Sequence, residues 1–273
     1  MAGDHEREVP RRELKIEVAS ELEKSEQEAW QRLLGTRVEV KPLPDYVASE
    51  VRRNLEQMGF GLRYVPSFDL GYVACLRERG VNKYLAELQR KYPKWKSLES
   101  LSYEERRDHS VPRNLEKWFW GRVENEDIGM PALSGQWIAV ETVEKPEYGT
   151  KYPKTPFVER IGFQDDRFNV SWNEAHNAIE REKPRILSDI GVSGRSVDLR
   201  FLEVIEWNLL ANREGWGKTN TYEWTNTEYR GSGDSRRLVA GSSDGGGAAN
   251  VYWVHPARSN GLVGFRAAVV LGS

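Results

Sequence analysis

The sequence contains a single cysteine, Cys75, among 273 residues, so no internal disulfide can form. No apolar run reaches the ~18 residues that a membrane span requires, and we therefore expect no membrane span. The first eight residues are polar and charged, so we also expect no signal peptide. These absences favour a protein kept in a reducing cytoplasm or carried in a virion. Cys75 lies in the apolar stretch 72–76 and is expected to be a buried thiol.

The sequence also lacks an excess of positive charge. Charged residues make up 30% of the chain, but the net charge is −2. A protein that binds nucleic acid needs a basic face to contact the phosphates, so no nucleic-acid partner is expected. Hydrophobic residues make up 38% of the chain, which predicts a folded protein with a substantial core, in one large domain or two ordinary ones.

The patterns of metal and phosphate sites are missing too. The four histidines lie far apart, with no His-x-x-x-His spacing that would predict zinc. They are His5, His109, His176 and His255. No calcium loop of the Asp-x-Asp-x-Asp type is present. The glycine-rich stretches 231–233 and 245–247 lack the lysine and the strand–helix context of a phosphate loop. We therefore expect neither a metal nor another cofactor.

The most unusual absence is confined to the C-terminal segment, residues 229–273. All 53 Lys, Glu, Gln and Met residues lie in the first 228 positions, and the last 45 positions contain none. At the earlier density, about ten would be expected there, and surface loops are normally rich in such residues. A tight glycine-rich turn region would explain the Gly and Ser of this segment, but explains the missing Lys and Glu less well.

Arginine, in contrast, remains in the C-terminal segment, beside Gly, Ser, Asn, Asp, Tyr, Trp, Val and Ala. Its arginines are Arg230, Arg236, Arg237, Arg258 and Arg266. Binding loops that recognise unpredictable partners favour Tyr, Ser, Gly, Asn, Trp and Arg. The composition therefore predicts a binding protein whose contact surface lies in residues 229–273.

Apolar spacing and capping patterns predict an α+β protein. We expect helices over 20–34, 44–58, 80–120, 171–182 and 197–212. We expect strands at 62–66, 136–143 and 269–271, with short β-like pieces throughout 218–273. Ser20 with Glu23 and Ser171 with Glu174 are capping-box pairs, which would place a helix start at each serine.

Three motifs occur in order: Val-Ser-Trp-Asn-Glu-Ala at 170–175, Tyr-Glu-Trp-Thr-Asn-Thr at 222–227, and Gly-Phe-Arg at 264–266. This series resembles the C-type lectin fold of the formylglycine-generating-enzyme type. A Gly, Ser and Asn-rich stretch before a terminal Gly-Phe-Arg resembles the variable proteins of diversity-generating retroelements, which occur in viruses, bacteria and archaea. The resemblance implies an N-terminal helical segment (1–58) and a C-type lectin-like domain (59–273). That domain would contain a helical insertion at about 80–122 and a variable region at about 229–263.

The resemblance implies a mechanism for the missing residues. In that family a reverse transcriptase copies a template with errors at adenines, and the copy replaces the 3′ end of the gene. Asn codons then become codons for many residues, but never for Lys, Glu, Gln, Met or Trp. The protein would display a hypervariable surface that binds an unknown protein or other surface ligand, without catalysis.

The resemblance also separates ligand-binding from scaffold positions. The variable, ligand-binding positions would be Arg230, Ser232, Asp234, Ser243, Asp244, Gly245, Val254, His255, Ala257, Arg258, Leu262 and Val263. The scaffold of the site would be Trp224, Tyr252, Trp253, Pro256, Gly264, Phe265 and Arg266. A varied side chain has to be exposed, so we expect Val254, Leu262 and Val263 to be exposed. For the two valines, the alternative is an ordinary strand residue that faces the core.

The main alternative is an enzyme of the same fold with an unrecognised site. Relatives that oxidise cysteine to formylglycine hold copper with two cysteines, and this chain has one. Glu203 with Glu206, or His176 with Glu180, could perform acid–base chemistry, but structural roles are far more common for such pairs. We therefore expect no catalytic residue. A viral structural or receptor-binding component is a third reading, which overlaps with the first.

Overall fold

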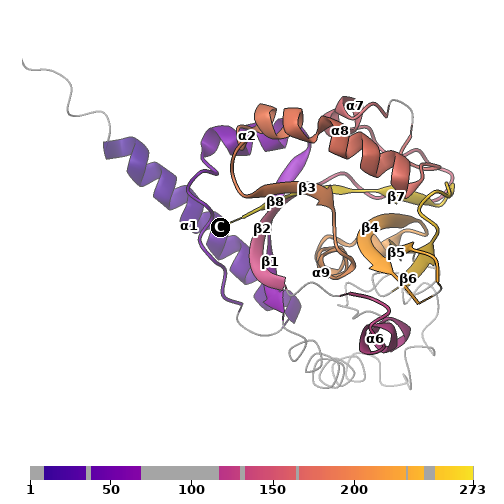
Figure 1. The fold of residues 1–273 in the computed structure, drawn as a ribbon. Helices are drawn as coiled ribbons and strands as arrows, with labels where there is room; N and C mark the ends of the chain where they lie inside the picture. Colours follow the sequence, from indigo (N-terminus) through magenta and orange to yellow (C-terminus); the bar gives the residue numbers. More distant parts are fainter. Residues whose placement is uncertain are drawn as a thin grey trace, which may run out of the picture.

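The computed structural model describes residues 9–34, 38–68, 117–129, 133–163, 166–231, 233–242 and 250–272. They form two four-stranded sheets with helices packed around them, which confirms the mixed α+β composition (Figure 1). None of the helices in these ranges combines the length and apolarity that a membrane crossing requires. Cys75, most of the predicted insertion, Ser232, Ser243, Asp244 and Gly245 lie outside the described residues.

The first sheet contains the last strand of the chain in its interior. Its strands are β1 (Phe60–Phe68), β2 (Leu133–Glu141), β3 (Val197–Phe201) and β8 (Ala267–Leu271), in the order β1-β2-β8-β3. All neighbouring pairs are antiparallel. Ala268 is paired with Val140 on one side and with Arg200 on the other. The C-terminal strand is therefore an integral part of the core rather than an appendage.

The second sheet is built almost entirely from the C-terminal part of the chain. Its strands are β4 (Tyr222–Tyr229), β5 (Arg236–Gly241), β6 (Val251–Val254) and β7 (Val263–Phe265), in the order β6-β5-β4-β7. Strand β7 runs parallel to β4, whereas the other pairs are antiparallel. Only Arg266 separates β7 from β8. This one residue therefore links the two sheets.

Helix α8 (Trp172–Ile190) begins as the sequence predicts. The Ser171 hydroxyl accepts a hydrogen bond from the Glu174 amide, and the Glu174 carboxylate accepts one from the Ser171 amide. The helix continues beyond the expected end at residue 182, because Ile186 and Ile190 are fully buried beyond Pro184. It ends at Gly191, whose left-handed φ of 90° favours glycine.

Two other helix predictions need correction. The predicted helix over 197–212 consists of strand β3 followed by α9 (Val204–Glu214). Val197, Leu199 and Phe201 alternate with polar residues, and pairing with β8 selects the strand. Helix α2 (Ser49–Gln57) begins later than the predicted Pro44. The remaining helical elements are α6 (Lys117–Glu124), α7 (Pro156–Arg160) and η3 (Trp216–Lys218), and α6 includes the end of the predicted insertion.

Helix α1 (Val9–Leu34) starts before the predicted Ser20. Pro10 lies in its first turn, where proline is tolerated, and no helix breaker follows. The Trp30 indole donates to the Tyr64 carbonyl (2.6 Å), and the Tyr64 amide donates to the Glu26 carboxylate (2.8 Å). Glu26 also pairs with Arg213 of α9. These contacts place Trp30 in the same core as the sheets, across the expected boundary at residue 58.

Candidate ligand-binding surface

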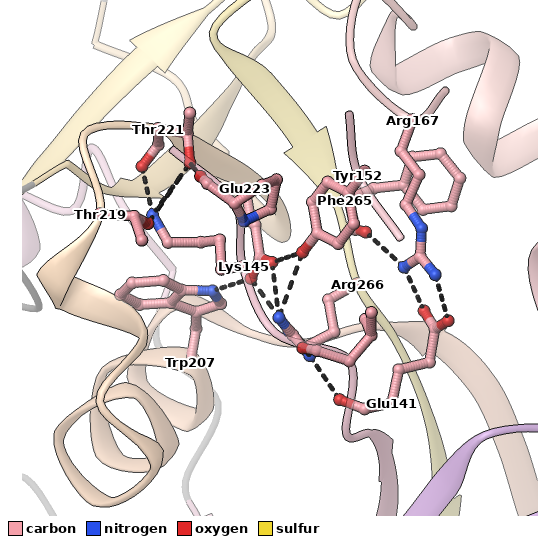
Figure 2. Close-up of polar contacts among 12 residues, drawn as sticks. Glu141, Lys145, Tyr152, Arg167, Trp207, Thr219, Thr221, Glu223, Phe265 and Arg266 are labelled. Carbon is pink, nitrogen blue, oxygen red and sulfur yellow. Dashed lines mark hydrogen bonds and ion pairs between the residues drawn. The ribbon is translucent and has the colours of Figure 1, made fainter. Parts of the chain in front are cut away.

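Arg266 is buried where the chain passes from one sheet to the other, and its guanidinium has several partners. Nη2 lies 2.9 Å and Nε 3.2 Å from the two carboxylate oxygens of Glu223 on β4. Nη1 donates to the Glu141 carbonyl (Figure 2). It also donates to the Val143 carbonyl at 2.8 Å. The Trp216 ring lies under the guanidinium carbon, 4.0 Å away. The side chain is thus paired, hydrogen-bonded and stacked.

Glu223 is the fully buried partner of Arg266. Its carboxylate also accepts hydrogen bonds from the Trp207 indole (2.7 Å) and the Tyr152 hydroxyl. Burial alone would raise the pKa of this carboxyl, but Arg266, Lys145 and the Tyr152 hydrogen bond together lower it. Burial raises the pKa of the Tyr152 hydroxyl well above its usual value, so Tyr152 keeps its proton and donates. Glu223 therefore stays ionised inside the protein.

A second buried ion pair, between Arg167 and Glu141, contacts the two residues that flank Arg266 in the sequence. Arg167 binds Glu141 through two hydrogen bonds of 2.8 and 3.0 Å. Arg167 also donates to the Phe265 carbonyl (3.1 Å), and Glu141 accepts from the Ala267 amide (3.0 Å). Both peptide neighbours of Arg266 are therefore bound by buried charged groups. This fixes the path of the backbone between β7 and β8.

Lys145 completes what we call the buried junction: Glu141, Lys145, Tyr152, Arg167, Trp207, Glu223 and Arg266. The Lys145 ammonium donates to the Thr221 carbonyl. Burial, opposed by Glu223 and assisted by Arg266, lowers the pKa of Lys145 to about 7. A Cβ at Gly241 would lie 2.8 Å from the Thr221 carbonyl and 2.9 Å from Lys145 Nζ. With a φ of +121°, that position accepts only glycine.

The C-terminal segment also forms a concave surface with a volume of about 610 Å³. It is formed by the start of β5, by β6 and by the turn that follows β6. The lining residues, which we use to define the concave surface, are Asp234, Arg236, Tyr252, Trp253, Val254, His255, Arg258, Ser259 and Asn260. Four of them are positions that the sequence predicts for ligand binding: Asp234, Val254, His255 and Arg258.

Aromatic rings stack along one wall of the concave surface. Tyr252 and Trp253 have ring centroids 5.3 Å apart and planes inclined by 10°. Trp253 also stacks on Tyr229 at 6.1 Å and 16°. The Arg236 guanidinium lies 4.0 Å from the Trp253 ring. Tyr252 is 54% exposed, so the stack ends in a ring that faces solvent.

The other predicted ligand-binding positions differ in exposure. Arg230 and Ala257 are exposed but do not line the concave surface, and Leu262 is half-buried. The expectation that Val263 is exposed is wrong, because it is only 2% exposed. Val263 begins β7 and is paired with Tyr222, which places it in the core. Of the two valines, Val254 is half-buried and lines the concave surface.

Most predicted scaffold residues are buried. Trp224, Phe265 and Arg266 are at most 1% exposed. Gly264 is also buried, and a Cβ there would lie 2.8 Å from the Tyr152 ring.

Three scaffold positions are more accessible. Pro256 is half-buried, and its carbonyl accepts from the Asn173 amide at 3.0 Å. Trp253 is half-buried as well. Tyr252 lies at the surface, where its ring is stacked on that of Trp253.

Sequence reasoning missed several residues of both regions. Arg236, Ser259 and Asn260 line the concave surface but were not among the predicted positions. Their residue types match the binding-loop composition, which could have identified them. Nothing in the sequence identifies Lys145 and Glu223 as buried charged residues, because their partners are far away in the sequence.

The residues considered for catalysis have structural partners. Glu206 forms two hydrogen bonds of 2.8 Å with Arg200 and accepts from the Glu203 amide at the start of α9. The Glu203 carboxylate accepts from the Thr227 hydroxyl (2.6 Å). The His176 ring stacks on Trp172 at 4.2 Å. Within the described residues, no three His, Cys, Asp or Glu side chains are grouped to hold a metal ion.

No protein-family model matches the sequence, and a comparison with curated proteins gives no match either.

The buried ion pair yields a stability prediction. Glu223→Gln leaves the positive charge of Arg266 in the core without its ion-pair partner. Arg266→Met leaves the negative charge of Glu223 without its partner. We expect each single variant to lose about 3–5 kcal/mol of unfolding free energy in urea denaturation. The double variant should lose much less unfolding free energy than the two single variants lose together. Arg230→Met removes an exposed pair with Glu228 and should cost at most about 1 kcal/mol. If the double variant loses as much unfolding free energy as the two single variants together, Glu223 and Arg266 do not stabilise each other.

Lys145 yields a pH prediction. Its pKa is about 7 in the folded protein and 10.5 in its ordinary state. Between these values the unfolded chain binds the extra proton, so this lysine makes the unfolding free energy rise with pH, by about 1.4 kcal/mol per unit. Below pH 7 both states are protonated and the effect ends.

The unfolding free energy of Lys145→Met, relative to that of the unmodified protein, should therefore fall as the pH rises from 7 to 9, measured by urea denaturation at each pH. Lys151→Met, at an exposed lysine of the same loop, should give a difference that does not change with pH. A pH-independent difference for Lys145→Met would contradict the lowered pKa.

Proposed function

We propose that this chain is a ligand-binding protein without catalysis, of the C-type lectin fold, whose C-terminal surface is diversified by a retroelement. The observation that carries the proposal is the division of the C-terminal segment. The concave surface and the residues of the Gly-Phe-Arg motif both come from the stretch that lacks Lys, Glu, Gln and Met. The concave surface is exposed, whereas the motif is buried. A binding surface whose side chains vary requires such a rigid, buried support.

The mutual contacts of the three sequence motifs support the proposed fold. The Trp224 indole of the second motif donates to the Val170 carbonyl of the first (2.9 Å). The Trp172 indole of the first motif donates to the Thr225 carbonyl of the second (3.0 Å). Trp224 is also paired with Phe265 of the third motif across β4 and β7. Motifs far apart in the sequence thus form one contact cluster.

The position of the exposed residues supports tolerance to substitution. His255, Ala257 and Arg258 are exposed in the turn between β6 and β7. The two ends of the connection are fixed by buried structure, since β6 is paired with β5, and β7 leads into the buried junction. A side chain exposed on such a connection can change without creating a cavity or burying a polar group.

The gene itself provides the test. Sequencing the DNA downstream of the coding region should find a near-copy of the segment that encodes residues 229–273, beside a reverse-transcriptase gene. The two copies should differ only where the template has adenine, and the differing codons should include those of His255 and Arg258. Absence of the copy, or differences spread over all four bases, would refute diversification.

A further inference from the structure

We propose that the concave surface binds an acidic polypeptide segment that presents an aromatic side chain beside its carboxylates. The inference rests on the proposed function, because it specifies the ligand of the same surface. Two arginine side chains, an exposed aromatic ring and an adjacent strand edge carry it.

The first observation concerns charge. Arg236 and Arg258 both line the concave surface, whereas Asp234 is its one carboxylate. Arg258 is exposed, and its guanidinium has no hydrogen-bond or ion-pair partner within the described part of the chain. Arg236 Nε is a buried donor without a hydrogen-bond partner among those residues. Guanidinium groups bind carboxylates with two parallel hydrogen bonds, so these two side chains favour an acidic ligand.

The charges around these arginines leave a modest positive excess. Asp234 offsets the charge of one of the two arginines in the lining. A ligand with a few carboxylates fits this balance. A polyphosphate chain would require a broader basic face, and the whole protein carries a net charge of −2.

The second observation is the stack of near-parallel rings. Tyr229, Trp253 and Tyr252 follow one another at 6.1 and 5.3 Å, and the Tyr252 ring is the exposed end. A planar group of the ligand can continue the stack on that ring. Since the arginines lie in the same lining, an aromatic side chain close to a carboxylate would contact both features at once.

The third observation favours a polypeptide over other anions. Strand β6 is the edge of its sheet, bonded to β5 on one side and to no other strand of the described residues. An edge strand offers backbone amides and carbonyls to an extended peptide. Tyr252 and Trp253 belong to this strand, so a peptide that adds to the edge would pass the stacked rings. Tyr, Trp and Arg are also the residues that contribute most to protein–protein binding energy.

Binding of a random copolymer of glutamate and tyrosine tests the proposal. Isothermal titration calorimetry should detect binding to the full chain at low salt. Arg258→Glu and Tyr252→Ser should each weaken it at least tenfold. The matched controls are Arg185→Glu, at an exposed arginine of α8, and Tyr148→Ser, at a tyrosine that is 62% exposed. Both should bind like the unmodified protein.

Comparison polymers exclude the other ligand classes. Polyglutamate should bind at least tenfold more weakly than the copolymer, and a copolymer of lysine and tyrosine should not bind. Equal binding of polyglutamate would overturn the aromatic part of the proposal. Tighter binding of heparin or oligothymidylate would identify a general polyanion surface and overturn it. Failure of the glutamate–tyrosine copolymer to bind overturns this ligand class. An adenine-specific downstream copy would still support the proposed function in that case, so the two failures are distinguishable.

Discussion

The ion pair between Glu223 and Arg266 is the interaction on which the arrangement of the two sheets depends. Arg266 is the only residue between β7 and β8, so its side chain fixes where the chain leaves one sheet and enters the other. A charge so deeply buried is stable only with a charged partner and additional hydrogen bonds. Tyr152, Trp207 and the backbone carbonyls of β2 and the following loop provide them. Loss of either charge would leave the other uncompensated.

This constraint divides the C-terminal segment into two populations of residues. The residues that enter the buried junction or pair in β7 cannot change without a cost in stability. On the turn between β6 and β7, the side chains of His255, Ala257 and Arg258 are exposed to solvent, and we expect them to contribute little to stability. The chain thus passes from an exposed turn into a strand at the centre of the first sheet, an arrangement that fits the proposed variable surface on a rigid support. The concave surface and the buried junction consist of different residues.

Sequence reasoning succeeded where the signal was local. The capping box at Ser171 marks the start of α8, as the sequence predicts. It failed where pairing with a distant strand decided the outcome. Residues 197–201 satisfy both a helical and an alternating pattern, and only their pairing with β8 makes them a strand. The same holds for Val263, which is buried because it pairs with Tyr222, and for Tyr252, which is exposed at an edge that the sequence does not reveal.

A substitution scan of residues 250–272 tests the central claim most directly. Each position would be replaced by every other residue, and the folded fraction of each variant measured by resistance to proteolysis. We expect most substitutions at His255, Ala257 and Arg258 to change stability by no more than about 0.5 kcal/mol. Those at Val263, Phe265 and Arg266 should cost about 2–5 kcal/mol. Equal sensitivity at Arg258 and Phe265 would contradict the division into a variable surface and a buried support.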